Sequence, residues 1–244
     1  MVPEFVASLL LDRPNFVEPP KIGHEVAKSH RPSGASVGHL YDALAPDYDR
    51  RHARWLRYAG GEAQAAVEGA VRALIGPNTE MLDVGCGTGR FIRRLIDDGL
   101  VPHRVTLLDV SGRMLSYSND LPVTHVKAPM DRIPISDGSL DLVTCLWALE
   151  TIEDRPAAIR EILRVLKPGG WACFAFCADK SFCSPMGRIL RRSVERLGAG
   201  SFLQSDEIIT NLSAMRDVAV RQIPCGGPAT ALLCRRGDTE LRQG

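Results

Sequence analysis

The stretch Met81-Leu82-Asp83-Val84-Gly85-Cys86-Gly87-Thr88-Gly89-Arg90-Phe91 carries the strongest structural signal in this chain. An apolar run ends near an acidic residue, and three glycines then follow at alternate positions. Glycine lets the backbone turn tightly and approach a ligand that a Cβ atom would push away. The pattern predicts a strand, a loop and a helix, as in nucleotide sites. A tight turn that holds no ligand is the alternative.

The spacing of these glycines limits the classes of ligand that the loop could bind. A pyrophosphate-binding loop has the pattern G-x-G-x-x-G, whereas the last glycine here arrives one position early. The sequence contains no G-x-x-x-x-G-K-[ST], which excludes a P-loop.

A second acidic residue, Asp109, follows Gly89 by twenty positions and ends the apolar run 105–108. A carboxylate at the tip of the next strand can accept hydrogen bonds from both hydroxyls of a ribose. Such bonds to an ionised acceptor are stronger than bonds between neutral groups. We therefore expect Asp109 to hold a ribose, the alternative being an ordinary loop carboxylate.

Composition fits one domain, or a domain with a small cap: the 244 residues are 45% apolar and 24% charged. The net charge of +1 gives no basic field that would drive nucleic-acid binding, so we expect no nucleic-acid partner. No apolar run is long enough for a spanning helix. The run 6–11 lacks the basic region of a secretory signal, so we expect a cytoplasmic protein. The seven cysteines are scattered and are expected to be free, mostly core, residues.

Strands and helices alternate through the middle of the chain. Strands are expected at 81–84, 104–109, 124–127, 140–146 and 171–177, and helices at 38–58, 62–75, 88–98, 157–166 and 205–215. This alternation predicts a parallel sheet with helices on both faces. Two closely spaced strand candidates, 218–223 and 230–234, predict a terminal antiparallel hairpin.

Four segments together resemble the class I S-adenosylmethionine (SAM) dependent methyltransferases of the small-molecule type. They are the D-x-G-x-G-x-G frame, the run 109–115, the run 132–143 and the run 158–170, whose R-E-I-L-R-V-L-K-P-G-G matches closely. The run 41–49 is similar to the Y-D-x-x-A-x-x-Y-D entry of many such enzymes. The resemblance implies a Rossmann-like, seven-stranded, mostly parallel sheet with a C-terminal antiparallel hairpin.

The resemblance also implies SAM as the cofactor and a set of residues around it. The expected cofactor-binding residues are Asp83, Gly85, Cys86, Gly87, Gly89, Asp109, Val110, Met114, Met130, Asp131, Leu146 and Trp147. The chain departs from the family pattern at Pro129, where an acidic residue is common. Met130 could still offer its backbone N–H and Asp131 its carboxylate to the adenine. Thr151 stands where many relatives have a histidine, so a histidine base is absent there.

Residues 1–36 are rich in Pro, His and polar residues with little periodicity, so we expect an irregular extension there, and the resemblance implies a methyltransferase domain at 37–244. Within that domain we expect a helical lid at 37–60 and a substrate-side insertion at 181–204. The substrate-side candidates are Tyr41, Tyr48, Trp55 and Glu150. No catalytic base is assigned, no metal is expected, and the oligomeric state is left open.

The leading functional hypothesis is methyl transfer from SAM to a small-molecule acceptor. In-line displacement needs mainly alignment of the nucleophile, the methyl group and the sulfur. The alternatives are a non-catalytic SAM-binding partner subunit, or a methyltransferase that acts on RNA, protein, a thiol or a metalloid.

Overall fold

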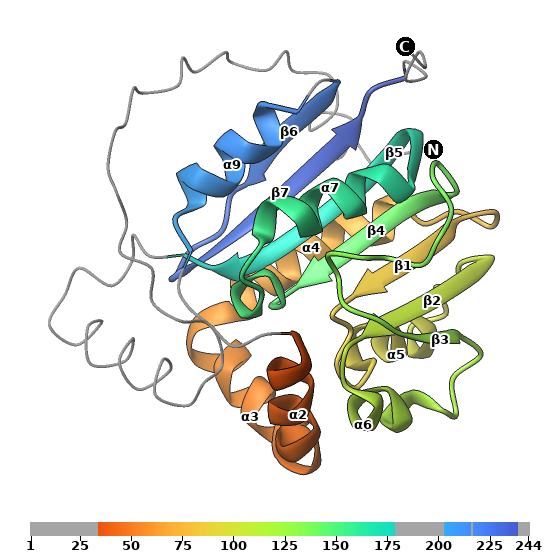
Figure 1. Cartoon of the computed structure of the whole chain (residues 1–244), viewed down its shortest axis with the longest axis vertical. Helices are drawn as coiled ribbons and strands as arrows, with labels where there is room; N and C mark the ends of the chain where they lie inside the picture. Colours follow the sequence, from red (N-terminus) through yellow and green to blue (C-terminus); the bar gives the residue numbers. More distant parts are fainter. Residues whose placement is uncertain (1–33, 179–202, 216, 239–244) are drawn as a thin grey trace, which may run out of the picture.

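The computed structural model describes residues 34–178, 203–215 and 217–238 (Figure 1). Nearly all of the extension expected at 1–36 therefore lies outside the described residues, as does the insertion expected at 181–204 apart from Leu203 and Gln204.

Seven strands form one mixed sheet in the order β3-β2-β1-β4-β5-β7-β6. Their bounds are β1 (Glu80–Val84), β2 (Arg104–Asp109), β3 (Thr124–Lys127), β4 (Leu140–Leu146), β5 (Leu166–Cys177), β6 (Val218–Ile223) and β7 (Ala229–Arg236). Strands β1 to β5 pair in parallel, while β7 runs antiparallel to both β5 and β6. The seven-stranded architecture expected from the sequence is confirmed.

Helices cover both faces of the sheet, with α7 and α9 in front of it in Figure 1 and α4 and α5 behind it. The helices are α4 (Gly61–Leu74), α5 (Arg90–Asp97), α6 (Gly112–Leu115), α7 (Arg155–Val165) and α9 (Ser205–Ser213), with short turns η3 (Ser116–Ser118) and η4 (Leu149–Thr151). Side chains alternate along each strand, so Met81 joins the core under α4 and α5 while Leu82 joins the core under α7 and α9.

The lid is a run of consecutive helical segments ahead of α4. It consists of α2 (Gly34–Leu44), η1 (Ala45–Asp47), α3 (Tyr48–Trp55) and η2 (Leu56–Gly60). Helices α2 and α3 lie at the lower edge of the sheet in Figure 1, where β1 and β4 end. Parallel strands present their carboxyl ends at this edge, which is the usual ligand edge of open α/β sheets.

The largest departure from the sequence expectation is the start of β5. The strand begins at Leu166 rather than at Trp171 because Leu166 already pairs with Leu140. The next pair joins Trp171 to Leu142, so the residues between form a bulge on the β5 side. Gly169 in this bulge has a φ of +77°, a conformation that suits glycine.

The helical region expected at 38–58 begins four residues earlier, at Gly34, and is divided into four segments, whereas the ends of the other long helices differ by a residue or two from their predicted positions. Helix α5 starts at Arg90 because Gly89 before it is left-handed, with a φ of +73°. Ser111 caps α6, since its hydroxyl accepts the Met114 N–H at 3.0 Å. Helix α9 has no side-chain cap at its start, and the Ser205 hydroxyl contacts the Thr230 hydroxyl at 2.7 Å.

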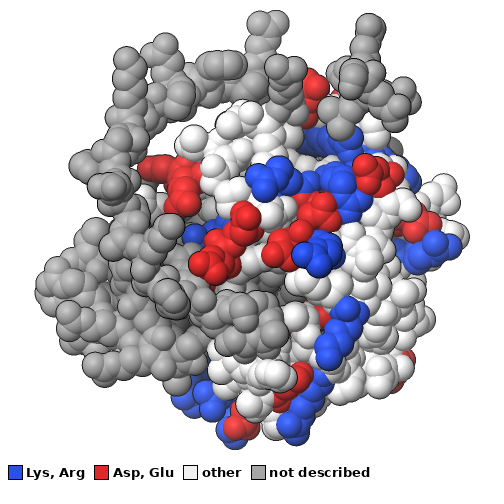
Figure 2. All heavy atoms as spheres, viewed as in Figure 1, with Lys and Arg blue, Asp and Glu red and all other residues white. Residues whose placement is uncertain are grey.

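The six described cysteines are unpaired, as expected, but only half of them are buried. These are Cys145, Cys173 and Cys234, which lie in the core. Cys183 lies outside the described residues. Acidic and basic side chains are intermixed on the described part of the face in Figure 2. The described helices include none that is long and apolar enough to cross a membrane.

Candidate active site

The glycine loop joins β1 to α5 through left-handed backbone conformations that only glycine adopts readily. Gly85 and Gly87 have φ values of +67° and +55°. A Cβ atom on Gly85 would lie 2.3 Å from the Cβ of Ala148, so protein packing excludes a side chain there. A Cβ on Gly87 would lie 3.4 Å from the Tyr48 ring, within the cavity described below. Gly85 is thus required by packing, and Gly87 keeps space open toward the lid.

Asp109 at the end of β2 supports this loop directly. Its Oδ2 accepts the Gly87 N–H at 2.8 Å and its Oδ1 accepts the Ser111 N–H at 2.8 Å. Burial raises the pKa of the Asp109 carboxyl, and these N–H groups oppose the rise. Each carboxylate oxygen can accept a further hydrogen bond. The side chain is therefore held at the cavity wall with acceptor capacity to spare.

Asp83 at the end of β1 lies deeper. It is 2% exposed, and its Oδ1 accepts the Thr144 hydroxyl at 2.6 Å. Burial raises the pKa of Asp83 to about 7. Together with Cys86 and Leu146, this carboxyl lines a small hollow of about 40 Å³ next to the glycine loop.

A cavity of about 570 Å³ opens at the carboxyl ends of β1, β2 and β4, a size typical of small-molecule sites. It is lined by Val37, Tyr41, Tyr48, Gly85, Gly87, Leu108, Asp109, Val110, Ala128, Pro129, Met130, Asp131, Trp147, Ala148, Thr151, Ile152, Glu153, Asp154 and Pro156. The smaller hollow shares Tyr48, Gly85 and Trp147 with it, so the two spaces adjoin.

Aromatic side chains form the lid side of the cavity. The Tyr48 ring packs edge-on to Tyr41, with centroids 6.1 Å apart, and stacks on His52 at 5.6 Å. Burial lowers the pKa of His52 to about 4, so this imidazole is neutral at pH 7. Burial also raises the pKa of both tyrosines, which keeps their phenols protonated.

Two aspartates of the lid fasten it to the cofactor side. Asp42 accepts the Ser111 hydroxyl at 2.5 Å and the Arg113 N–H at 3.1 Å, at the start of α6. Asp49 accepts the Thr88 hydroxyl at 2.6 Å, just before α5. Each Y-D pair of the sequence thus supplies a ring for the cavity and a carboxylate that bonds the lid to the start of α5 or α6.

Trp147 follows β4 and separates the two spaces. Its φ of +60° is unusual for a bulky residue and is typical of functional sites. Its backbone N–H donates to Ala175 at 2.7 Å, and its Nε1 donates to Gln64 Oε1 at 2.6 Å. Trp55 packs edge-on against it with centroids 5.9 Å apart. The indole is therefore fixed from both the sheet and the lid.

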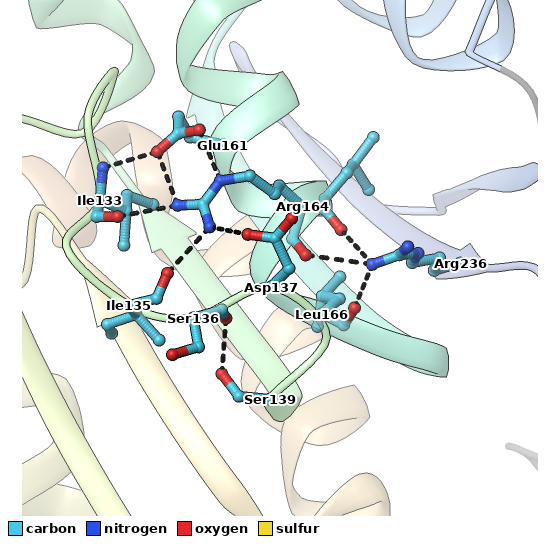
Figure 3. A network of polar contacts seen from close by, with 10 residues as sticks. Ile133, Ile135, Ser136, Asp137, Ser139, Glu161, Arg164, Leu166 and Arg236 are labelled. Atoms are coloured by element: carbon cyan, nitrogen blue, oxygen red, sulfur yellow. Dashed lines mark hydrogen bonds and ion pairs between the residues drawn. The ribbon is translucent and has the colours of Figure 1, made fainter. Parts of the chain in front are cut away.

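The opposite wall is the loop that contains Met130 and Asp131, and Arg164 of α7 anchors the residues that follow it (Figure 3). The Arg164 guanidinium donates to the Ile133 carbonyl at 2.8 Å and to the Glu161 carboxylate at 2.7 Å. Glu161 in turn accepts the Ile133 N–H at 2.8 Å. The R-E-I-L-R segment of the sequence thus holds the cavity wall without entering the cavity.

The structure brings most of the predicted site residues together. Gly85, Gly87, Asp109, Val110, Met130, Asp131, Trp147, Tyr41 and Tyr48 line the cavity, while Asp83, Cys86 and Leu146 line the smaller hollow. Gly89, Met114, Trp55 and Glu150 line neither space. Gly89 turns the chain into α5, Met114 is fully buried, and Trp55 supports Trp147.

Sequence reasoning missed part of the cavity wall. The segment after β4 lines it through Thr151, Ile152, Glu153, Asp154 and Pro156. The sequence had indicated only that Thr151 replaces a histidine there. The position of these residues directly after β4 was the available signal, because residues after strand ends meet at one edge. Among the described residues, no cluster of three or more His, Cys, Asp or Glu side chains could hold a metal ion.

These features fit SAM as a ligand. A ribose needs a fixed carboxylate with free acceptor capacity, and Asp109 provides it. A flat adenine needs apolar walls, and Val110 and Met130 both face the cavity. When bound, SAM supplies a methyl group carried on a positively charged sulfur.

Comparisons with known proteins also indicate a SAM-dependent methyltransferase. A family described as a methyltransferase domain matches residues 82–174. The chain is similar to malonyl-[acyl-carrier protein] O-methyltransferase of Serratia marcescens, with 29% identity over 175 residues that span 69% of this chain and 67% of that protein. It is also similar to ubiquinone/menaquinone biosynthesis C-methyltransferase UbiE of Stenotrophomonas maltophilia, with 31% identity over 152 residues that span 56% of each.

A solved structure shares the fold. The DhpI–SAH complex superposes with a TM-score of 0.63 at 22% identity, covering 84% of this chain and 98% of that chain. The glycine loop and Asp109 line a cavity suited to SAM, and the matched family is a methyltransferase domain. The chain belongs to the class I SAM-dependent methyltransferases.

Proposed function

We propose that this methyltransferase acts on a small-molecule acceptor bound beneath the lid. The observation that carries the proposal is the single cavity in which the glycine loop and Asp109 face the lid tyrosines and Trp147. A volume of about 570 Å³ leaves room for an acceptor beside a cofactor.

In this proposal Asp109 accepts the ribose hydroxyls, and Gly85 and Gly87 lie against the methionine end of the cofactor. Val110 and the segment 129–131 surround the adenine, with Met130 and Asp131 offering polar contacts. Asp83, Cys86, Leu146 and Trp147 border the space toward the methyl group. The assignments are supported by the positions of these residues around the two adjoining spaces.

The chain's residues would act mainly by positioning. Tyr48 and Trp147 exclude water and hold the acceptor in line, which can supply much of the rate of a displacement. The relatives named above are O- and C-methyltransferases, so their names leave the acceptor atom open.

The test is a screen with SAM labelled in the methyl group and a cell metabolite extract, each sample treated with nuclease or protease in parallel. Label in a small molecule that survives both treatments supports the proposal. Label that disappears with nuclease or protease identifies a macromolecular acceptor and contradicts it. SAM binding without any transfer identifies a binding subunit.

A further inference from the structure

Gln64, near the start of α4, is a buried amide that holds the indole of Trp147. The side chain is 4% exposed, which is uncommon for glutamine. Its Oε1 accepts the Trp147 Nε1–H at 2.6 Å. The indole has a single polar atom, so this bond fixes which way its polar edge faces.

The other end of the amide is also bonded. Gln64 Nε2 donates to Glu68 Oε1 at 3.0 Å, one turn further along α4, and Glu68 forms an ion pair with Arg94 of α5. A carboxylate only accepts hydrogen bonds, whereas an indole N–H only donates them. The two partners therefore require one orientation of the amide, and the network joins α4 and α5 to Trp147.

Gly60 encloses the same indole from another side. A Cβ atom there would lie 2.7 Å from Trp55 Nε1 and 2.9 Å from the Trp147 ring. The φ of −95° and ψ of −8° at Gly60 are ordinary for any residue, so the backbone does not demand glycine at this position. The absent side chain instead leaves room for two rings that pack edge-on.

These contacts decide where the ring of Trp147 lies. Its backbone N–H is bonded to Ala175, but the side chain could still occupy other rotamers. Trp147 lines both the large cavity and the smaller hollow, whereas Gln64 lines the hollow alone and Gly60 lines neither. The position of the indole thus sets the boundary between the two spaces.

Building on the proposed function, we propose that Gln64 is a positioning residue for methyl transfer. Its amide holds the Trp147 indole in the orientation that keeps the acceptor in line with the methyl group, and Gly60 provides the space that the ring occupies. Misplacement of bound reactants by about 1 Å can slow a reaction by about 10²-fold. Release of the indole should therefore slow transfer while the cofactor keeps its contacts with Asp109.

The variant Gln64→Met removes the bond to the indole and retains an unbranched side chain of similar length. Glu68 keeps its ion pair with Arg94. With the acceptor found in the labelled screen, we expect kcat to fall by about tenfold or more while the Kd for SAM stays within about threefold. Gln222→Met, which changes an exposed amide on β6, is the matched control and should behave as the wild type.

The variant Gly60→Ala displaces the ring from the other side and leaves Gln64 unchanged. We expect kcat to fall by about fivefold or more, again with little change in the Kd for SAM. Gly69→Ala is the matched control, because a Cβ atom at Gly69 of α4 would meet nothing within 4 Å. This pair also decides the matter if Gln64→Met does not fold.

Two measurements separate positioning of the indole from a general effect on structure. In a Trp147→Phe background the bond is already absent, so adding Gln64→Met should change kcat by less than about twofold. The protein has three tryptophans, and Trp147→Phe identifies the Trp147 signal among the indole N–H resonances. With S-adenosylhomocysteine bound, we expect this N–H to exchange with solvent at least about tenfold faster in Gln64→Met.

Four results overturn the inference. They are a wild-type kcat in Gln64→Met, a wild-type kcat in Gly60→Ala, an equal loss of kcat from Gln64→Met with and without the Trp147 indole, and a loss of SAM affinity as large as the loss of kcat. Any of these alongside wild-type methyl transfer refutes the role of Gln64 and leaves the proposed function standing. Failure of the wild type to transfer label refutes both.

Discussion

Replacing Asp109 with alanine should weaken SAM binding strongly. The carboxylate would give up its proposed bonds to the ribose, and a hydrogen bond to a charged group contributes about 1.5–3 kcal/mol. The loss of one such bond lowers affinity at least tenfold, and the loss of two lowers it by roughly 10²- to 10⁴-fold. Titration calorimetry of SAM against the wild type and Asp109→Ala measures this change.

The same substitution also affects the free protein, because Asp109 accepts the N–H groups of Gly87 and Ser111. Each buried N–H left without a partner costs about 1–3 kcal/mol. Urea unfolding of the ligand-free variant therefore has to accompany the calorimetry. Asp120→Ala, which removes an exposed carboxylate paired with Arg93, is the control for losing a charge. A folded Asp109→Ala variant that binds SAM within about twofold of the wild type would refute the ribose assignment.

Three further changes probe the loop, the lid and the buried carboxyl of Glu150. Gly87→Val places a branched residue at a φ of +55° beside Tyr48, so SAM binding should fall at least tenfold, while backbone strain of about 1–2 kcal/mol should lower the melting temperature of the free protein by about 2–8 °C; outright unfolding of the free variant would show that the glycine is mainly structural. Thr88→Val removes the hydroxyl bound to Asp49, and we expect SAM to dissociate several-fold faster in stopped-flow measurements, whereas Thr88→Ser should behave as the wild type. Because burial raises the pKa of Glu150 from 4.5 to about 7, the unfolded state loses this proton first, and stability falls as the pH rises from about 4.5 to about 7. The contribution is at most about 3 kcal/mol, and it should be absent from urea unfolding curves of Glu150→Gln; equal pH dependence in both proteins would contradict the raised pKa.

The sheet could be predicted from the sequence because its signals are local. Apolar runs such as 140–146 and the glycine loop after β1 mark strand and loop positions without knowledge of tertiary contacts. The start of β5 was missed because Lys167-Pro168-Gly169-Gly170 has the composition of a turn, and only the pairing of Leu166 with Leu140 makes it a bulge.

The candidate site was predictable for the residues that belong to motifs and much less so for their partners. Asp42 and Asp49 stand out in the sequence, but their contacts to Ser111 and Thr88 span 69 and 39 positions of the chain. No local pattern encodes such pairs. The bond from Trp147 to Gln64 likewise spans 83 positions, and only the folded structure shows it.

The most direct test of the account is a crystal structure of the chain with S-adenosylhomocysteine. We predict both ribose hydroxyls within hydrogen-bond distance of the Asp109 carboxylate and the adenine between Val110 and Met130. The sulfur should lie above the glycine loop and face the space between Tyr48 and Trp147. A ligand bound elsewhere, or one whose ribose points away from Asp109, would contradict the account.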